Sequence, residues 1–375
     1  MRIVKEFFFQ VACFAAIMAL LYLLLAVTAR TDIRKPGNAQ LRVALFINGT
    51  LGDKSFFDSA AHGIDQARKT LPVFAKVIEG GVDPTRWEAA LTDLADSGEY
   101  DLIITGTFAM VPYVQKLAED FPESHFMVFD AAVDYQKCRC KNVHSMLFRQ
   151  NEGAYLAGFF AEKLMQNGLP DVVPGSGLGV IGGMQISVIE DFLTGFRAGA
   201  KAASPDVQVL SQFANSFSDP AAGKDIAKAQ YARGVGLIFH AAGATGQGVN
   251  EAAAEARRYA IGVDIDQYAL YRVSNPQRAA RIVTSVIKNV DVGILRAVQQ
   301  QLAGSLAYGQ IESLGLAEGG VRLARDSDVM AKVPAEVLKS LNEAERAVIE
   351  KRVQVPGVFT QMPIASGDAS VKSKP

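Results

Sequence analysis

The chain has 375 residues and a net charge of −1, with 49% hydrophobic and 21% charged residues. This length suits two domains of ordinary size, and the composition excludes a chain that is disordered over most of its length. The 38 basic and 39 acidic residues leave no charge excess for binding nucleic acid, three cysteines exclude a disulfide-stapled scaffold, and four scattered histidines disfavour a zinc enzyme.

The N-terminus carries an almost wholly apolar run at residues 7–27, preceded by Arg2 and Lys5. A helix of about 20 such residues crosses the hydrocarbon core of a bilayer. We therefore expect a transmembrane anchor or a signal peptide over residues 1–29. The run exceeds the core of about 7–15 residues that is usual in a signal peptide, which favours an uncleaved anchor. No second run of this kind follows, so the chain crosses a membrane once at most.

After a polar linker at residues 30–40, short apolar runs alternate with longer segments of helical pattern. Strands are predicted at residues 41–47, 74–77, 102–105, 126–129, 179–181, 207–210, 236–239 and 260–263. Helices are predicted at residues 55–71, 87–98, 111–120, 153–167, 189–202, 223–233, 249–259 and 284–302. Continuous Val/Ile/Leu strands between helices indicate parallel sheets covered on both faces.

The number of strand–helix units favours an α/β fold with two doubly wound lobes and a hinge. A single (β/α)8 barrel is the rival architecture, but residues 321–361 have a loose pattern poor in strands. The predicted domains and hinges comprise a first lobe at 41–147 plus 265–305, a second lobe at 148–264 plus 306–362, crossings near 148–152, 262–266 and 305–315, and a flexible tail at 363–375.

Ligands of doubly wound sheets bind beyond the carboxyl ends of the strands. Asp130 and Asp264 each end a predicted buried strand, with no helix immediately after them, so ligand contact is favoured for both. Asp53 serves equally well as a helix cap or as a ligand contact. Phe56 and Phe239 are either core residues or rings that sandwich a flat ligand.

Sequence motifs for catalysis are absent. The G-x-G-x-x-G match at 177–182 contains a strand where the dinucleotide fingerprint needs a turn, and there is no P-loop, Ser-His-Asp or Cys-His arrangement. We expect no catalytic residue, no metal site and no cofactor. His240 alone lies at the strand-end edge, where a structural role is favoured. Cys138 and Cys140 are spaced too closely for an easy disulfide, so a loop with two thiols is expected rather than a metal pair with His144.

Several segments together resemble the basic membrane protein family of bacterial substrate-binding proteins, in its purine nucleoside receptor-like branch. They are GDKSF at 52–56, SFSD at 216–219, FHAAGATGQGV at 239–249, IGVDIDQ at 261–267 and TSVIKN at 284–289. The resemblance spans about residues 41–360. It implies a type I periplasmic-binding-protein fold, three crossovers between the lobes, and capture of a nucleoside for an ABC importer.

By motif, the resemblance implies that Phe56 and Phe239 sandwich the base. It implies that Asp130 and Asp264 hold ribose hydroxyls and that Lys288, on the last predicted helix, contacts the ligand. From the residues alone, Lys288 is by default a solvated surface lysine. The family also implies a location in the bacterial periplasm or at the cell surface, where the N-terminal helix would tether the protein to the inner membrane.

The chain departs from the family pattern at three positions and lacks a lipidation cysteine. Asn48, Phe57 and Ala244 stand where the family usually has Asp, Asn and Gly. The complete set of candidate ligand-binding residues is Asn48, Asp53, Phe56, Phe57, Asp130, Phe239, Ala244, Asp264 and Lys288.

We expect a non-enzymatic solute-binding protein whose partners are a nucleoside, an ABC permease and, through the N-terminal helix, a membrane, but not nucleic acid. Two alternatives stay open. One is a membrane-anchored ligand sensor or partner-binding protein on the same fold, which the anchor favours and the lack of an output domain disfavours. The other is a nucleoside hydrolase that uses Asp130 or Asp264, although the sequence lacks the clustered aspartates of a metal-assisted hydrolase.

Overall fold

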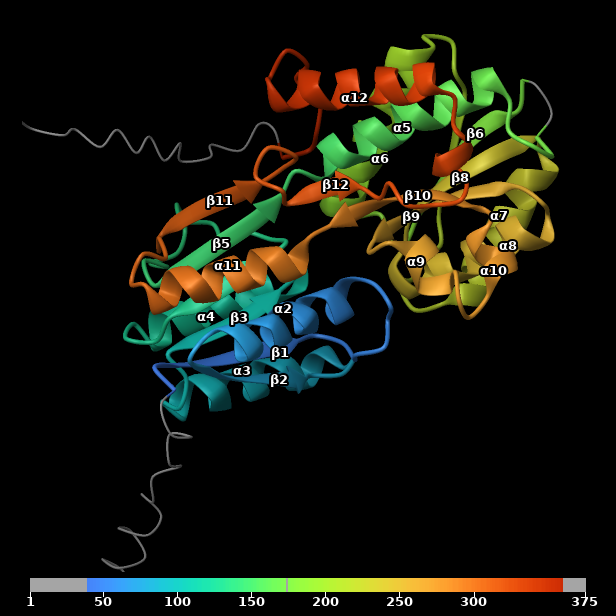
Figure 1. The fold of residues 1–375 in the computed structure, drawn as a ribbon. Helices are drawn as coiled ribbons and strands as arrows, with labels where there is room; N and C mark the ends of the chain where they lie inside the picture. The colour runs from blue at the N-terminus through green and yellow to red at the C-terminus, as the bar shows by residue number, and fades with distance from the viewer. Residues whose placement is uncertain (1–38, 173–174, 360–375) are drawn as a thin grey trace, which may run out of the picture. The chain divides into compact units, whose positions relative to one another are not determined.

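The structure, a computed structural model, describes residues 39–172 and 175–359. The predicted anchor or signal peptide, most of the predicted linker and the predicted tail at 363–375 lie outside the described residues. Within the described ranges, no helix has the length and apolar character needed to cross a membrane. The strands form two six-stranded sheets with helices on both faces, which confirms the predicted doubly wound α/β architecture (Figure 1).

The first sheet, with its helices, forms what we call lobe 1. Its strands are β1 (Leu41–Ile47), β2 (Val73–Glu79), β3 (Leu102–Gly106), β4 (Phe126–Phe129), β5 (Val143–Phe148) and β11 (Gln310–Leu314). Their order is β11-β5-β4-β3-β1-β2, and every neighbouring pair is parallel. Helices α2 (Phe56–Thr70) and α11 (Val290–Leu302) cover one face, and α3 (Trp87–Asp96) and α4 (Val111–Asp120) cover the other.

Lobe 2 is built on the second sheet. Its strands are β6 (Gly177–Gly182), β7 (Val209–Phe213), β8 (Val235–Ala241), β9 (Tyr259–Asp264), β10 (Ile282–Lys288) and β12 (Val321–Leu323). Their order is β12-β10-β9-β8-β6-β7, with β12 antiparallel to β10. Helices α5 (Gln150–Asn167) and α6 (Ser187–Ala203) cover one face, and α7 (Pro220–Ala232) and α8 (Gly246–Glu255) cover the other. Three further helices are α9 (Gln267–Tyr271), α10 (Pro276–Ala279) and α12 (Ala335–Ile349), the last packed on α5 (Figure 1).

Strand β1 shows why the strands are almost continuously apolar. Successive side chains of a strand point to opposite faces of the sheet. Val43, Leu45 and Ile47 pack in the core beneath α2 and α11, whereas Ala44 and Phe46 pack in the core beneath α3 and α4. Both faces are buried, so neither set of side chains can be polar.

The predicted helix at 284–302 is wrong in its first third. Residues up to Lys288 form strand β10, and helix α11 begins only at Val290. The segment Thr284-Ser-Val-Ile-Lys288 has β-branched residues at three of five positions, which suits a buried strand. The expected stretch at 321–361 is poor in strands, with only the short β12 among its described residues, but it is not loose, because helix α12 forms there.

The sheets divide the chain differently from the predicted lobe boundaries. Strand β10 pairs with β9, so residues up to 288 belong with lobe 2, and β11 pairs with β5, so residues 310–314 belong with lobe 1. The chain therefore crosses between the sheets at residues 149, 289 and 315–320. The first crossing lies within its predicted segment, the second lies beyond its predicted segment, and the third begins at the last residue of its predicted segment.

Candidate functional site

Two aspartates end parallel strands in different lobes. Asp130 follows β4, and Asp264 is the last residue of β9. Both have a left-handed backbone, with φ of 59° and 65°. Aspartate tolerates this conformation better than most residues, and such departures concentrate at functional sites. In both places the chain turns sharply at the strand end and leaves a carboxylate there.

Lys288 joins the two lobes at this edge. It is the last residue of β10, its side chain is almost fully buried, and its ammonium forms an ion pair with the Asp130 carboxylate. The ammonium also lies 5.4 Å from the ring centres of Phe56 and Phe148 and 5.6 Å from that of Phe192. The negative faces of aromatic rings attract cations, so the carboxylate and three rings together stabilise this buried charge.

The second aspartate pairs across the lobes as well. The hydroxyl of Ser55, in lobe 1, donates a hydrogen bond to the Asp264 carboxylate. Burial raises the pKa of Asp264 to about 6, although the charge of Lys288 opposes the shift. Burial likewise raises the pKa of Asp130, again against Lys288. We refer to Ser55, Phe56, Asp130, Asp264 and Lys288 as the inter-lobe cluster.

The aromatic part of the cluster belongs to the start of α2. The ring centre of Phe56 lies 5.5 Å from that of Phe129 and 5.4 Å from that of Phe57. Phe57 packs edge-on against Phe56 and over Gly49, where a Cβ atom would lie 2.4 Å from the Phe57 ring. Gly49, the second residue after β1, leaves room for this close approach, and a larger residue there would require the Phe57 ring to shift.

Asn48 presents a buried acceptor at the same edge of lobe 1. Its Nδ2 donates to the Thr107 hydroxyl at 3.0 Å, and its Oδ1 has no partner among the described residues. Thr107, which follows β3, has φ of 73° and ψ of 157°, a conformation that is costly for a β-branched residue. A donor group on a ligand would satisfy the Asn48 oxygen, since buried polar atoms are nearly always hydrogen-bonded.

Asp53 and Ala244 lie in the loops around this edge. The Asp53 carboxylate accepts hydrogen bonds from the backbone N–H groups of Ser55, Phe57 and Asp58, so it caps the first turn of α2. The cap is one of the two roles expected from the sequence. Ala244 belongs to the single helical turn between β8 and α8 and is partly exposed.

Phe239 does not lie in the inter-lobe cluster. Its side chain is 0% exposed, and its ring stacks on Phe196 of α6, with the centres 5.2 Å apart and an interplanar angle of 15°. Phe192 contacts both the Phe239 ring and the Lys288 ammonium. The residue points into the core of lobe 2 because its position in β8 directs it toward α6.

Phe239→Ala is therefore expected to lower the free energy of unfolding by about 3–5 kcal/mol, because it leaves a cavity in a close-packed core. Ligand affinity of the folded variant should be unchanged. Urea unfolding and calorimetry on the same preparation check both expectations. Phe56→Ala is the matched control, and a stable Phe239→Ala protein with weakened binding would contradict the core assignment.

Several residues at the site were not singled out from the sequence: Ser55, Thr107, Phe148, Phe192 and Phe217. Phe217 follows β7 at the carboxyl edge of lobe 2 and is partly exposed. Its ring packs over Gly183, where a Cβ atom would lie 2.3 Å from it. The SFSD segment was the available signal for this ring.

His240 is buried inside lobe 2, which fits the structural role expected from the sequence. It is fully buried, its Nε2 lies 3.1 Å from the Asn250 Oδ1, and burial lowers the pKa of His240 to about 4. The ring is neutral at physiological pH. In the described part of the chain, no group of three or more His, Cys, Asp or Glu residues is arranged to hold a metal ion.

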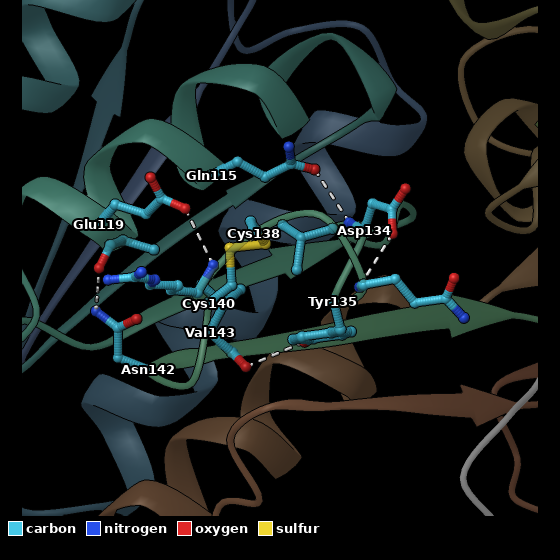
Figure 2. The surroundings of a disulfide bond; sticks show 12 residues. Gln115, Glu119, Asp134, Tyr135, Cys138, Cys140, Asn142 and Val143 are labelled. Carbon is cyan, nitrogen blue, oxygen red and sulfur yellow. Dashed lines mark hydrogen bonds between the residues drawn. A yellow bond between two sulfur atoms is a disulfide. The ribbon is translucent and has the colours of Figure 1, made fainter.

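Cys138 and Cys140 form a disulfide, so the expected pair of free thiols is wrong (Figure 2). The loop between β4 and β5 brings their Cα atoms to 5.3 Å, within the range that a disulfide spans. Close spacing in the sequence does not prevent the bond, because a single intervening residue can turn the chain enough to align the two side chains.

The chain is similar to known proteins over most of its length. Residues 40–358 match the family model described as ABC transporter substrate-binding protein PnrA-like. Basic membrane protein A of Borreliella afzelii is 30% identical over 84% of this chain and 91% of that protein. The CD4+ T-cell-stimulating antigen of Listeria monocytogenes is 30% identical over 82% of this chain and 85% of that protein.

Solved structures give the same fold. A solute-binding protein of an ABC transporter system from Aeropyrum pernix K1 has a TM-score of 0.74 and 27% identity, over 84% of this chain and 94% of that chain. A solute-binding protein from Agrobacterium vitis bound with alpha-D-tagatopyranose has a TM-score of 0.56 and 17% identity, over 80% of this chain and 98% of that chain. At that identity the second likeness shows the fold alone.

Proposed function

The chain belongs to the family of PnrA-like ABC transporter substrate-binding proteins, and from this premise we propose that it captures a nucleoside between its lobes and delivers it to an importer. The proposed binding residues are Phe56, Asp130, Asp264 and Lys288 of the inter-lobe cluster, together with Asn48, Phe57 and Phe217. The proposed partner for delivery is the permease of that importer. The role is binding without catalysis, as in its family.

The observation that carries the proposal is the pairing of groups from opposite lobes at the strand ends. The Asp264 and Asp130 carboxylates are strong acceptors for vicinal hydroxyls, and each is held at the edge by a residue of the other lobe. Phe56, beside them, offers a ring on which a planar base can stack. A ligand that has both a diol and a flat ring can bind the two carboxylates and stack on the Phe56 ring at the same time.

Calorimetry with adenosine, ribose and adenine tests this proposal. The nucleoside should bind, and the sugar and the base alone should each bind at least about tenfold more weakly, because each loses the contacts of the missing half. Ribose binding as tight as that of adenosine would overturn the proposal in favour of a sugar-binding protein, a class that includes several structural relatives. Absence of binding to all three would also overturn it.

We also propose that residues 41–359 lie outside the cytoplasm, tethered by an uncleaved helix at residues 7–27. The disulfide between Cys138 and Cys140 supports the location, since such bonds persist mainly in oxidising compartments. The length of the apolar run supports the tether. A mature N-terminus at Arg30 in native material would contradict the tether and leave the location intact.

The affinity for the nucleoside is expected to fall as the pH is lowered from 7 to 5. The Asp264 pKa of about 6 makes this group ionised at pH 7 and protonated at pH 5, and only the ionised form accepts hydrogen bonds at both oxygens. Calorimetry at pH 5, 6 and 7 measures the change, and Asp264→Asn should remove it.

The stability of the ligand-free protein should change in the opposite direction. The folded pKa of Asp264 lies above its ordinary value of 3.8, so this group's contribution to stability is complete below pH 3.8 and is lost as the pH rises through about 6. Affinity and stability that both decrease on acidification through pH 6 would contradict the assignment to Asp264.

A further inference from the structure

The disulfide of lobe 1 is unequally buried at its two ends. It lies in the loop at residues 131–142, where Cys138 is partly exposed and Cys140 is only 1% exposed. Thiol–disulfide exchange starts when a thiolate attacks one sulfur of the bond, so access decides which sulfur reacts. Only the Cys138 sulfur belongs to a side chain that solvent reaches appreciably.

The loop also carries positive charge around the two cysteines. Lys137, Arg139 and Lys141 alternate with them in the sequence, and all three are exposed. Lys137 pairs with Asp134 at 2.9 Å. Arg139 and Lys141, which bracket Cys140, form no ion pair with any residue in the described part of the chain. Reactive cysteines occupy such electropositive, partly exposed surroundings, because positive charge favours a thiolate that approaches or leaves.

Hydrogen bonds hold the loop in place in addition to the disulfide. Gln115 Oε1 accepts a hydrogen bond from the backbone N–H of Asp134, and Glu119 Oε1 accepts one from the backbone N–H of Arg139 (Figure 2). Asn142 Nδ2 donates hydrogen bonds to three backbone carbonyls, one in α4 and two just after it. The Tyr135 hydroxyl is hydrogen-bonded to backbone carbonyls of β5 and β11. The bond itself spans one intervening residue, and a loop this short restricts the unfolded chain little.

We propose that the Cys138–Cys140 pair is a thiol–disulfide exchange site for an extracytoplasmic dithiol, separate from nucleoside capture. A thiolate of the dithiol attacks the Cys138 sulfur, an intermolecular disulfide forms, and Cys140 leaves as a thiolate that takes up a proton. The second thiol of the partner then displaces Cys138. The two cysteines gain two electrons and two protons, and the dithiol is oxidised to its disulfide.

The native protein treated with dithiothreitol, followed by alkylation and peptide mapping, tests the proposal. Peptide mapping separates these cysteines from Cys13. Both thiols should appear without denaturant, and the melting curve of the reduced protein should stay close to that of the oxidised protein. Reduction that requires denaturant, or that proceeds only as fast as global unfolding, would overturn the proposal.

A matched pair of variants tests which sulfur is attacked. Cys140→Ser leaves the partly exposed thiol at Cys138, and Cys138→Ser leaves the buried thiol at Cys140. The thiol at Cys138 should react with iodoacetamide at least about tenfold faster. Equal rates, or faster reaction at Cys140, would overturn the assignment.

The effect of the three cations on exchange can be tested separately. Replacing Lys137, Arg139 and Lys141 by glutamine should slow reduction by glutathione, a negatively charged thiol, about several-fold at low salt. The difference should shrink at high salt, where exposed charges are screened. An unchanged rate at low salt would overturn the role of these cations.

Discussion

Lys288→Met is expected to lower the free energy of unfolding by about 3–5 kcal/mol at neutral pH, because it leaves the Asp130 carboxylate charged, buried and without its cation. Methionine keeps most of the side-chain volume among Phe56, Phe148 and Phe192, so the loss comes from the charge. Urea unfolding of the variant and the parent measures this loss in the free energy of unfolding.

Asp130→Asn in the Lys288→Met background is the control. The double variant removes both charges of the pair and should recover most of the stability that the single variant loses. The single variant should also lose less stability in acid, where a proton can neutralise Asp130. A double variant no more stable than Lys288→Met would show that the ion pair is not the source of the effect.

Asp264→Asn is expected to weaken nucleoside binding by about 10- to 150-fold, since a hydrogen bond to an ionised acceptor contributes about 1.5–3 kcal/mol. The affinity for the free base should change little, because the base has no ribose hydroxyls. Calorimetry with adenosine and adenine, with melting curves alongside, measures both effects. Equal losses for the two ligands would contradict a ribose contact at Asp264.

Ser55→Ala provides the matched control for that variant. The Ser55 hydroxyl donates a hydrogen bond to the Asp264 carboxylate, so a ligand hydroxyl has to compete with it. Removing the hydroxyl should leave the nucleoside affinity unchanged or raise it. A loss as large as that of Asp264→Asn would mean that Ser55 itself contacts the ligand.

Much of the fold could be predicted from local patterns. The run at 41–47 is apolar at every position except Arg42, and a strand buried on both faces requires such a run. The rule that ligands bind at the carboxyl ends of parallel strands pointed to Asp130 and Asp264 before any contact was known. The structure brings their two loops to the same inter-lobe cluster.

Lobe membership after residue 264 could not be predicted from local patterns. The segment at 284–288 has β-branched residues that suit a strand, but it runs directly into a helix, and a helical reading of the whole segment was possible. Pairing with β9 decides the matter, because hydrogen bonds to a neighbouring strand depend on residues about 20 positions away. Because of that pairing, Lys288 is the buried last residue of a strand instead of the solvated helix residue that was expected.

The sequence by itself determined the fold class, the apolar N-terminal run and the two aspartates at the strand ends, because periodicity and strand termini are local properties. Tertiary structure decided which phenylalanine faces the other lobe. Phe56 and Phe239 both adjoin motifs of the family, yet one lies beside Lys288 and the other stacks on Phe196. It also paired Lys288 with Asp130, Ser55 with Asp264, and Cys138 with Cys140. Each of these contacts depends on where the backbone directs a side chain in space, which sequence spacing does not specify.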